Sequence, residues 1–165
     1  MSKRTMTRAR ERAIALIRTS NAIYVGTHIR PDGDALGSLL GLSLALEAQG
    51  KRVARLCPDS VPPSYRFLPG AERVSSQPPE WPPDLGIVVD CDGLARVGPL
   101  AAAFERAPHL IDIDHHATDQ TFGEVRLVDP SAGAAAEIVH GLVRSLGAAD
   151  DPEVALVDMA AVAPE

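Results

Sequence analysis

The sequence predicts an α/β fold of three layers, in which a mainly parallel sheet of about five strands carries helices on both faces. Short apolar runs alternate with segments of helical periodicity along almost the whole chain, a pattern typical of parallel strands joined by helices. The chain has 165 residues, of which 45% are hydrophobic and 23% are charged. These values suit one globular domain.

The first third of the chain predicts two helices separated by a strand. Met6–Thr19 has a helical apolar stripe, and the short apolar run Ala22–Gly26 follows it as a strand. Ala35–Gln49 is the second helical segment, which Asp34 is placed to cap and Gly50 to end.

The middle of the chain predicts the remaining strands. Arg52–Cys57 is the second, and the proline-rich stretch Pro58–Pro83 follows it. Apolar runs then predict strands at Leu85–Asp90, Leu110–Asp114 and Val125–Val128. Because strands of the same kind lie on both sides of the proline-rich stretch, we interpret that stretch as a long surface connection and not as a domain boundary.

Two further helices are predicted near the end of the chain. Ala132–Leu146 has helical periodicity, with Ser131 in place to cap it and Gly147 to stop it. The last helix is expected to start at Asp150 or Asp151 and to run to the end.

The composition excludes several classes of protein. The chain has 16 basic and 22 acidic residues, a net charge of −6, whereas a surface that coats duplex nucleic acid is normally basic. Cys57 and Cys91 have no CxxC spacing and predict neither a disulfide framework nor a zinc site. Neither a signal peptide nor an apolar stretch of the ~20 residues that span a bilayer is visible. We therefore expect a cytoplasmic protein without a membrane partner.

Three predicted strands run directly into side chains that suit a divalent cation. These side chains are His28, Asp32 and Asp34 after the first strand, Asp90 and Asp92 after the third, and Asp114, His115 and His116 after the fourth. Ligands bind at the carboxyl ends of parallel strands, and carboxylates with imidazoles suit Mn²⁺, less often Mg²⁺, Fe²⁺ or Zn²⁺. Taken singly, each group also fits a turn, a helix cap or an ordinary histidine pair. Their occurrence at successive strand ends predicts a metal site.

These motifs resemble those of the DHH family of phosphoesterases. The resemblance rests on the run from His28 to Ser38 (HIRPDGDALGS), on Asp90 at the end of an apolar strand, and on Asp114-His115-His116. It spans about residues 20–147. The branch that it most resembles hydrolyses short oligoribonucleotides and 3′-phosphoadenosine-5′-phosphate. The resemblance implies the DHH domain fold and manganese-dependent phosphoester hydrolysis.

The resemblance also implies roles for individual residues. The ligands that it implies for two Mn²⁺ ions, with Mg²⁺ as the other candidate metal, are His28, Asp32 and Asp90 for one ion and Asp34, Asp90 and His115 for the second. His116 and Asp114 are the implied catalytic residues, since His116 would face the substrate phosphate and Asp114 would orient a neighbouring imidazole. Ser38 is a candidate for substrate binding, because it lies in the first turn of the helix after the first motif. Arg96 lies near the motifs and suits either a phosphate contact or the surface.

One part of the family pattern has no counterpart in the sequence. The family supplies a further aspartate from an Asp-Thr-Gly motif, and no such motif occurs in these 165 residues. We therefore interpret residues 1–165 as a DHH catalytic domain that is incomplete at its C-terminus and lacks the family's substrate-binding domain. Apolar surface left uncovered in this way would favour a homodimer. Whether the chain is a fragment or a short form stays open.

The predicted function is metal-dependent hydrolysis of short oligonucleotides or nucleoside phosphates such as 3′-phosphoadenosine-5′-phosphate. The expected partner is accordingly a small nucleotide or short oligonucleotide. One alternative is a manganese inorganic pyrophosphatase, which shares the ligand set. The other is a nucleotide-binding module without catalysis, because one metal ligand and the substrate domain have no counterpart here.

Overall fold

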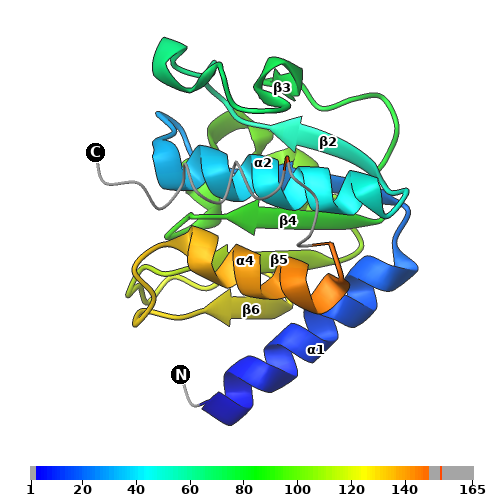
Figure 1. Cartoon of the computed structure of the whole chain (residues 1–165), viewed down its shortest axis with the longest axis vertical. Coiled ribbons are helices and arrows are strands. Elements are labelled where there is room, and N and C mark those ends of the chain that lie inside the picture. The colour runs from blue at the N-terminus through cyan, green and yellow to red at the C-terminus, as the bar shows by residue number, and fades with distance from the viewer. Residues whose placement is uncertain (1–2, 149–152, 154–165) are drawn as a thin grey trace.

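A six-stranded sheet forms the middle layer of the structure, a computed structural model that describes residues 3–148 and residue 153 (Figure 1). The strands lie in the order β3-β2-β1-β4-β5-β6, and every neighbouring pair is parallel. Their bounds are β1 (Ala22–Gly26), β2 (Arg52–Leu56), β3 (Val74–Ser75), β4 (Leu85–Val89), β5 (Leu110–Asp114) and β6 (Val125–Val128). The sequence predicted all of these except β3, whose two residues lie within the proline-rich stretch and are too few to form an apolar pattern.

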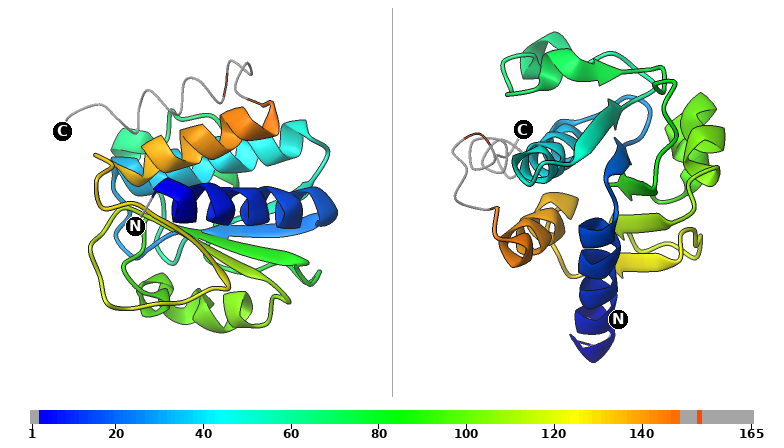
Figure 2. Two further views of the ribbon diagram at one scale, coloured as in Figure 1. Left: turned by 90° about the horizontal axis from the view of Figure 1, so that it is seen from below. Right: turned by 90° about the vertical axis from the view of Figure 1, so that its right-hand side faces the viewer.

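Helices cover both faces of the sheet, and the predicted fold class is confirmed. One face carries α1 (Lys3–Thr19), α2 (Gly33–Ala48) and α4 (Ala135–Leu146), and the opposite face carries α3 (Ala101–Glu105) after the 3₁₀ segment Leu94–Leu100 (Figure 2). None of the helices in the described part of the chain is long and apolar enough to cross a membrane.

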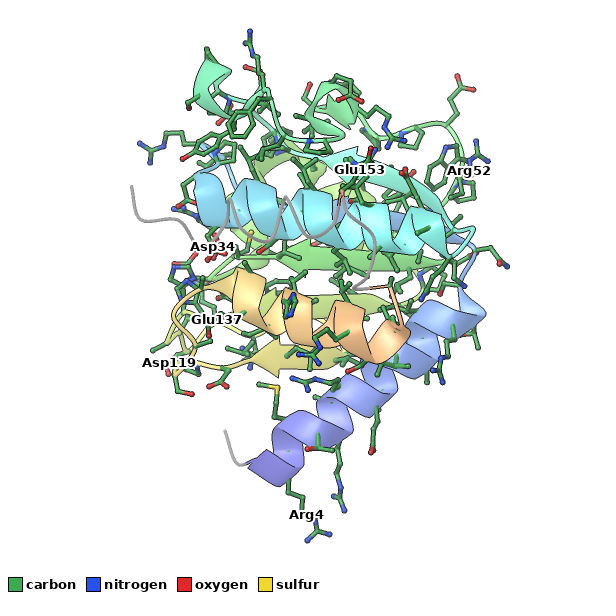
Figure 3. All side chains as sticks on the ribbon, in the orientation of Figure 1. Arg4, Asp34, Arg52, Asp119, Glu137 and Glu153 are labelled. Carbon is green, nitrogen blue, oxygen red and sulfur yellow. The ribbon has the colours of Figure 1, made fainter. Side chains whose placement is uncertain are left out.

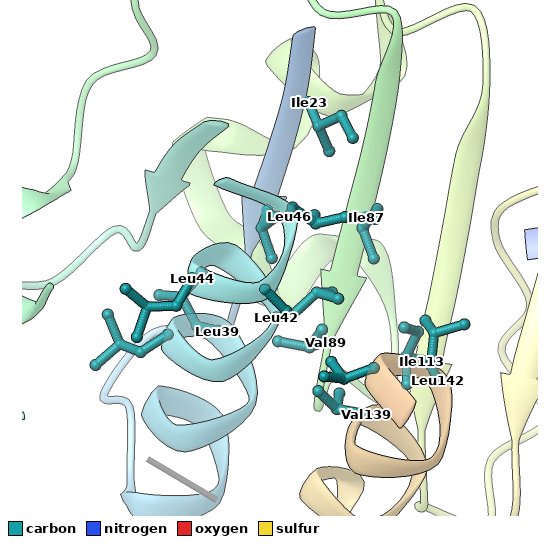
Figure 4. Packing of buried hydrophobic residues seen from close by; sticks show 14 of the residues in the cluster. Ile23, Leu39, Leu42, Leu44, Leu46, Ile87, Val89, Ile113, Val139 and Leu142 are labelled. Atoms are coloured by element: carbon teal, nitrogen blue, oxygen red, sulfur yellow. The ribbon is translucent and has the colours of Figure 1, made fainter. Parts of the chain in front are cut away.

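Helix α2 is the centre of the larger core. Every residue from Ala35 to Leu46 is buried, because this helix packs against strands of the sheet on one side and against α4 on another. Figure 4 shows Leu42 of α2, Val89 of β4 and Val139 of α4 close together in this core. Burial of each large apolar side chain contributes about 1.5–3 kcal/mol. The core therefore fixes the first turn of α2, which carries part of the predicted metal site.

The smaller core lies on the opposite face and centres on Phe104 and Tyr24. Phe104 is fully buried, and the ring of Tyr24 meets that of Trp81 edge to face at 5.0 Å between centroids. The Tyr24 hydroxyl donates a hydrogen bond to the carbonyl oxygen of Trp81 at 2.6 Å. These contacts attach the proline-rich connection to β1. Two 3₁₀ turns lie within that connection, at Pro63–Tyr65 and Ala71–Arg73.

The predicted cap of α2 was wrong by two residues. The helix begins at Gly33, and its N-cap is Asp32, whose carboxylate accepts a hydrogen bond from the backbone N–H of Ala35 at 3.0 Å. Asp34, the predicted cap, lies inside the first turn. The error arises because both aspartates precede the apolar segment, and either one suits an N-cap by residue type.

The predicted start of α4 was wrong as well. The helix begins at Ala135 and not at Ala132, and Ser131 does not cap it. The Ser131 hydroxyl instead donates to the carboxylate of Asp129 at 2.6 Å within a tight turn. The predicted stop was right, since Gly147 is the C-cap and has a left-handed backbone with φ of 79°.

Two further helical segments complete the comparison with the predicted elements. The helical segment from Leu94 to Glu105 was not predicted, because Gly98 and Pro99 interrupt it and leave no continuous helical period. The last predicted helix lies outside the described residues, apart from Glu153.

The contact between Gly26 and Phe104 generates a prediction about stability. A Cβ atom at residue 26 would overlap the Phe104 ring, so Gly26→Ala should lower the free energy of unfolding by about 1–3 kcal/mol in urea denaturation. Phe104→Leu should reduce the penalty in the double variant, with Phe104→Leu alone as the control. An unchanged urea midpoint for Gly26→Ala would contradict the close packing.

Candidate metal centre

The strand order defines a switch point between β1 and β4. From β1 the chain proceeds outward to β2 and β3, then returns to β4 on the other side of β1. Ligands of parallel α/β sheets bind at the carboxyl ends of the strands at such a point. His28 and Asp32 follow β1, Asp90 follows β4, and Asp114 ends β5. The structure therefore brings the three predicted motifs to one edge of the sheet.

Asp90 lies in the middle of these groups. Its side chain is 3% exposed, and its Oδ2 lies 3.5 Å from Nε2 of His28 while its Oδ1 lies 3.6 Å from Nε2 of His115. Asp90 Oδ1 has no hydrogen-bond partner among the described residues. Burial raises the pKa of Asp90 above its ordinary value, against the opposing effect of the hydrogen bond from His28. The backbone φ of 57° is unusual outside glycine and is of the kind that clusters at functional sites.

His28 turns one ring nitrogen toward Asp90. Its Nδ1 lies 2.7 Å from the carbonyl oxygen of Ile29, which only accepts hydrogen bonds, so Nδ1 carries a proton and Nε2 faces Asp90. The hydrogen bond with Asp90 raises the pKa of His28, and burial acts in the opposite direction.

Asp34 lies between the starts of α2 and α4 (Figure 3). Its carboxylate accepts hydrogen bonds from the backbone N–H groups of Ala135 and Ala136, at 2.8 and 2.9 Å. Its Oδ2 also lies 3.5 Å from Nε2 of His115. Asp34 therefore joins the first motif to the third and to helix α4.

The Asp114-His115-His116 motif forms a compact hydrogen-bonded unit. Asp114 is 1% exposed, and its Oδ1 accepts from the backbone N–H of His115 at 2.8 Å and from Nδ1 of His116 at 2.7 Å. Asp114 thus makes the contact expected of a residue that orients an imidazole. Burial acts to lower the pKa of His116, yet the carboxylates of Asp114 and Asp90 outweigh it and raise the pKa.

Two sets of side chains could hold a cation in the described part of the chain. Within each set the ligand atoms lie within 4.8 Å of one another, and the sets are His28, Asp32 and Asp90, and Asp90, His115 and His116. The first matches the predicted ligand set. The second contains Asp90 and His115 as predicted, with His116 where Asp34 was expected.

Most of the chain matches a known family of proteins. Residues 22–163 match the family model described as the DHH family, N-terminal domain. The chain belongs to the DHH family. The resemblance drawn from the motifs is thereby confirmed.

Relatives of this DHH chain are substantially longer. It is 40% identical over 136 residues to the bifunctional oligoribonuclease and PAP phosphatase NrnA of Thermus thermophilus, a match that covers 81% of this chain and 40% of that protein. It is 28% identical over 130 residues to the Bacillus subtilis protein of the same name, covering 77% of this chain and 40% of that one. The chain thus spans about 40% of the length of these curated relatives.

Solved structures show the same fold. An exopolyphosphatase-related protein from Bacteroides fragilis superposes with a TM-score of 0.84 at 22% identity, over 93% of this chain and 48% of that chain. The exonuclease RecJ bound to manganese superposes with a TM-score of 0.52 at 23% identity, over 94% of this chain and 43% of that chain. At these identities the likeness concerns the fold alone.

The two candidates for substrate binding have different surroundings. Ser38 is fully buried, and its hydroxyl donates to Oδ1 of Asp34 at 3.3 Å. Arg96 is 44% exposed, and its Nε lies 3.6 Å from the carboxylate of Asp92. The structure thus places Ser38 behind a predicted ligand and Arg96 at the surface, and the substrate contacts of both stay predictions.

Asp112 is a buried carboxylate that motif reasoning missed. It is 2% exposed, and its Oδ2 accepts a hydrogen bond from Nε of Arg126, its register partner on β6, at 3.1 Å. Arg126 also donates to the carbonyl oxygen of Gln120 at 3.4 Å, so the pair holds the loop that follows His116. The available signal was a single charge inside the apolar run Leu110–Asp114, but its partner depends on strand register.

The pKa of Asp112 predicts how stability depends on pH. Burial raises this pKa from an ordinary value of 3.8 to about 7, so between these pH values the folded chain binds more protons than the unfolded chain. The contribution of Asp112 to the free energy of unfolding is therefore fully present below about pH 4, and it is lost as the pH rises through about 7. In the metal-free parent chain, this group should lower the free energy of unfolding by about 1 kcal/mol per pH unit between pH 5 and 7. Asp112→Asn should abolish this contribution to the slope.

The control for this measurement is Asp119→Asn, which neutralises an exposed aspartate on the neighbouring loop. Urea denaturation at each pH compares slopes and not absolute stabilities, because the asparagine also changes the pairing of Arg126. Identical slopes for the parent chain and Asp112→Asn would show that Asp112 keeps an ordinary pKa.

Proposed function

We propose that this DHH chain is a metal-dependent phosphoesterase that hydrolyses short oligonucleotides or nucleoside phosphates such as 3′-phosphoadenosine-5′-phosphate. The observation that carries the proposal is Asp90, a buried carboxylate with an unpaired oxygen between the imidazoles of His28 and His115. Family membership supports phosphoester hydrolysis, and the relatives named as oligoribonuclease and PAP phosphatase support the substrate class.

The side chains at the sheet edge fit divalent cations. Carboxylates grouped around imidazoles suit Mn²⁺, with Mg²⁺ as the second candidate, and RecJ of the same fold was solved with manganese. We assign His28, Asp32 and Asp90 to one ion, and Asp90 and His115 with Asp34 to a second. When bound, such ions polarise phosphoryl oxygens and lower the pKa of a water molecule.

His116 is the side chain that we assign to the substrate phosphate. Its Nδ1 is held by Asp114, which leaves Nε2 free, and the side chain is 48% exposed. Nε2 therefore lies on the exposed side of the ring, where the protonated imidazole can donate a hydrogen bond to a phosphoryl oxygen. A donor fixed in this way stabilises negative charge as it develops in the transition state.

The sequence also led us to expect a cytoplasmic location and a homodimer. The thiols of Cys57 and Cys91 are free and buried, which supports the predicted cytoplasmic location. The expected homodimer stays a prediction.

The metal assignment predicts unequal effects for two neighbouring aspartates. Asp90→Ala should weaken Mn²⁺ binding by roughly 100-fold or more in calorimetric titration, because it removes the carboxylate shared by both ligand sets. Asp92→Ala is the matched control, since Asp92 is 50% exposed and pairs with Arg96. Equal effects of the two changes, or no Mn²⁺ binding by the parent, would refute the assignment.

The substrate assignment predicts an order of preference. With Mn²⁺ present, the chain should hydrolyse dinucleotides or 3′-phosphoadenosine-5′-phosphate faster than duplex DNA or inorganic pyrophosphate, measured as kcat/KM. His116→Ala should lower kcat by about 10²–10³-fold through loss of the phosphate donor. His109→Ala is the control, because His109 pairs with Glu124 away from the motifs.

Each alternative has its own result in this assay. Preferential hydrolysis of pyrophosphate would favour the inorganic pyrophosphatase. Nucleotide binding without turnover would favour the binding module, and preferential cleavage of duplex DNA would contradict the proposed substrate class.

A further inference from the structure

Asp34 makes an unusual connection between two helices. It belongs to the first turn of α2, yet its two carboxylate oxygens accept hydrogen bonds from the first two residues of α4, which are 101 and 102 positions away in the sequence. Oδ2 accepts from Ala135 at 2.8 Å and Oδ1 from Ala136 at 2.9 Å. The N-cap residue of α4 is Ala134, which offers no capping side chain. Asp34 therefore supplies the cap that the local sequence of α4 lacks.

The surroundings hold this carboxylate in one orientation. The backbone N–H groups at a helix start have no partner within the helix and carry partial positive charge, so they favour an anion. The hydroxyl of Ser38, one turn further along α2, donates to Oδ1 at 3.3 Å. Ser38 is fully buried, and so is Ala135. The Asp34 carboxylate is thus fixed by three donors from two helices.

This orientation still leaves Asp34 able to bind a cation. A carboxylate has about four lone-pair sites, and the three donors leave capacity on Oδ2. Oδ2 is also the oxygen that faces the neighbouring motif, since Nε2 of His115 lies 3.5 Å from it. His115 Nε2 lies in turn 3.6 Å from Asp90. The free side of Asp34 therefore points toward the second ligand set.

We propose that the first turn of α4 and the hydroxyl of Ser38 are positioning elements for the second cation, because they hold Asp34 where it joins Asp90 and His115 as a ligand. This inference rests on the proposed function. It makes Ser38 a residue that contacts a metal ligand and not the metal itself. It also explains why Ala134 at the N-cap has no capping side chain, since the N–H groups at the start of α4 bind the carboxylate of Asp34. Hydrogen-bond partners of metal ligands typically affect metal affinity by 10–100-fold.

Two substitutions remove the donors separately. Ser38→Ala removes the hydroxyl. Ala135→Pro removes one backbone N–H, and proline is tolerated at the first position of a helix. Ala134 has φ of −156° and ψ of 155°, the extended conformation that a residue before proline prefers, so this variant is compatible with the backbone. Ser43→Ala is the matched control, since Ser43 is a buried serine of α2 whose hydroxyl donates to the carbonyl oxygen of Leu39.

The measurement is calorimetric titration of each metal-free variant with Mn²⁺, after circular dichroism has established that it is folded. Ser38→Ala and Ala135→Pro should each weaken the second binding event by about 10–100-fold and leave the first within about threefold of the parent. Ser43→Ala should leave both events unchanged. Since Ala135 is buried, Ser38→Ala decides the question if the proline variant does not fold.

The possible failures are distinguishable. Parental affinity for both ions in folded Ser38→Ala would show that the Ser38 hydroxyl does not position Asp34 for the second cation and would overturn the inference alone. A parent chain that binds fewer than two Mn²⁺ ions would overturn the two-ion centre of the proposed function and this inference with it.

Discussion

Electrostatic repulsion among the carboxylates at one edge of the sheet is the constraint on which the rest of this site depends. The protein itself supplies backbone N–H donors to Asp32, Asp34 and Asp114, from α2, from α4 and from the residue after β5. Asp90 is different, because no backbone N–H among the described residues donates to its side chain, which faces the imidazoles of His28 and His115 instead. It is therefore the position at which added positive charge would relieve the most repulsion.

The core determines where these groups lie. Helix α2 is buried along twelve consecutive residues from Ala35 to Leu46, so its first turn cannot shift without disturbing the packing against β4 and α4. On the opposite face, the Phe104 ring lies directly against Gly26, the last residue of β1 before the first motif. The two cores thus hold the first motif from both sides. The arrangement of the site is a consequence of ordinary apolar packing.

The parts of the fold that could be predicted from the sequence are those with a local signal. Strands β1, β4 and β5 are short apolar runs, and His28, Asp90 and Asp114 were found because each lies at or just beyond the end of such a run. Family motifs then gave each residue an expected role.

The parts that could not be predicted depend on contacts between distant residues. The cap of α4 comes from Asp34, and no feature of the sequence around Ala135 points to a partner 101 residues away. Asp112 finds Arg126 only through the register of β5 and β6, which a single sequence does not reveal. The strand-end motifs of the site were therefore predictable from the sequence, and the contacts that hold them in place were not.

The Asp34 cap also has a consequence for the order of events in folding. Closing a chain segment of about 100 residues has an entropic cost that local contacts do not carry, so contacts of this separation form slowly. During synthesis, α2 emerges long before α4, and the start of α4 has no side-chain cap of its own. The first turn of α4 becomes fully stable only after the sheet has assembled and Asp34 has reached it. Assembly of the candidate metal centre is thus coupled to a contact between residues about 100 positions apart.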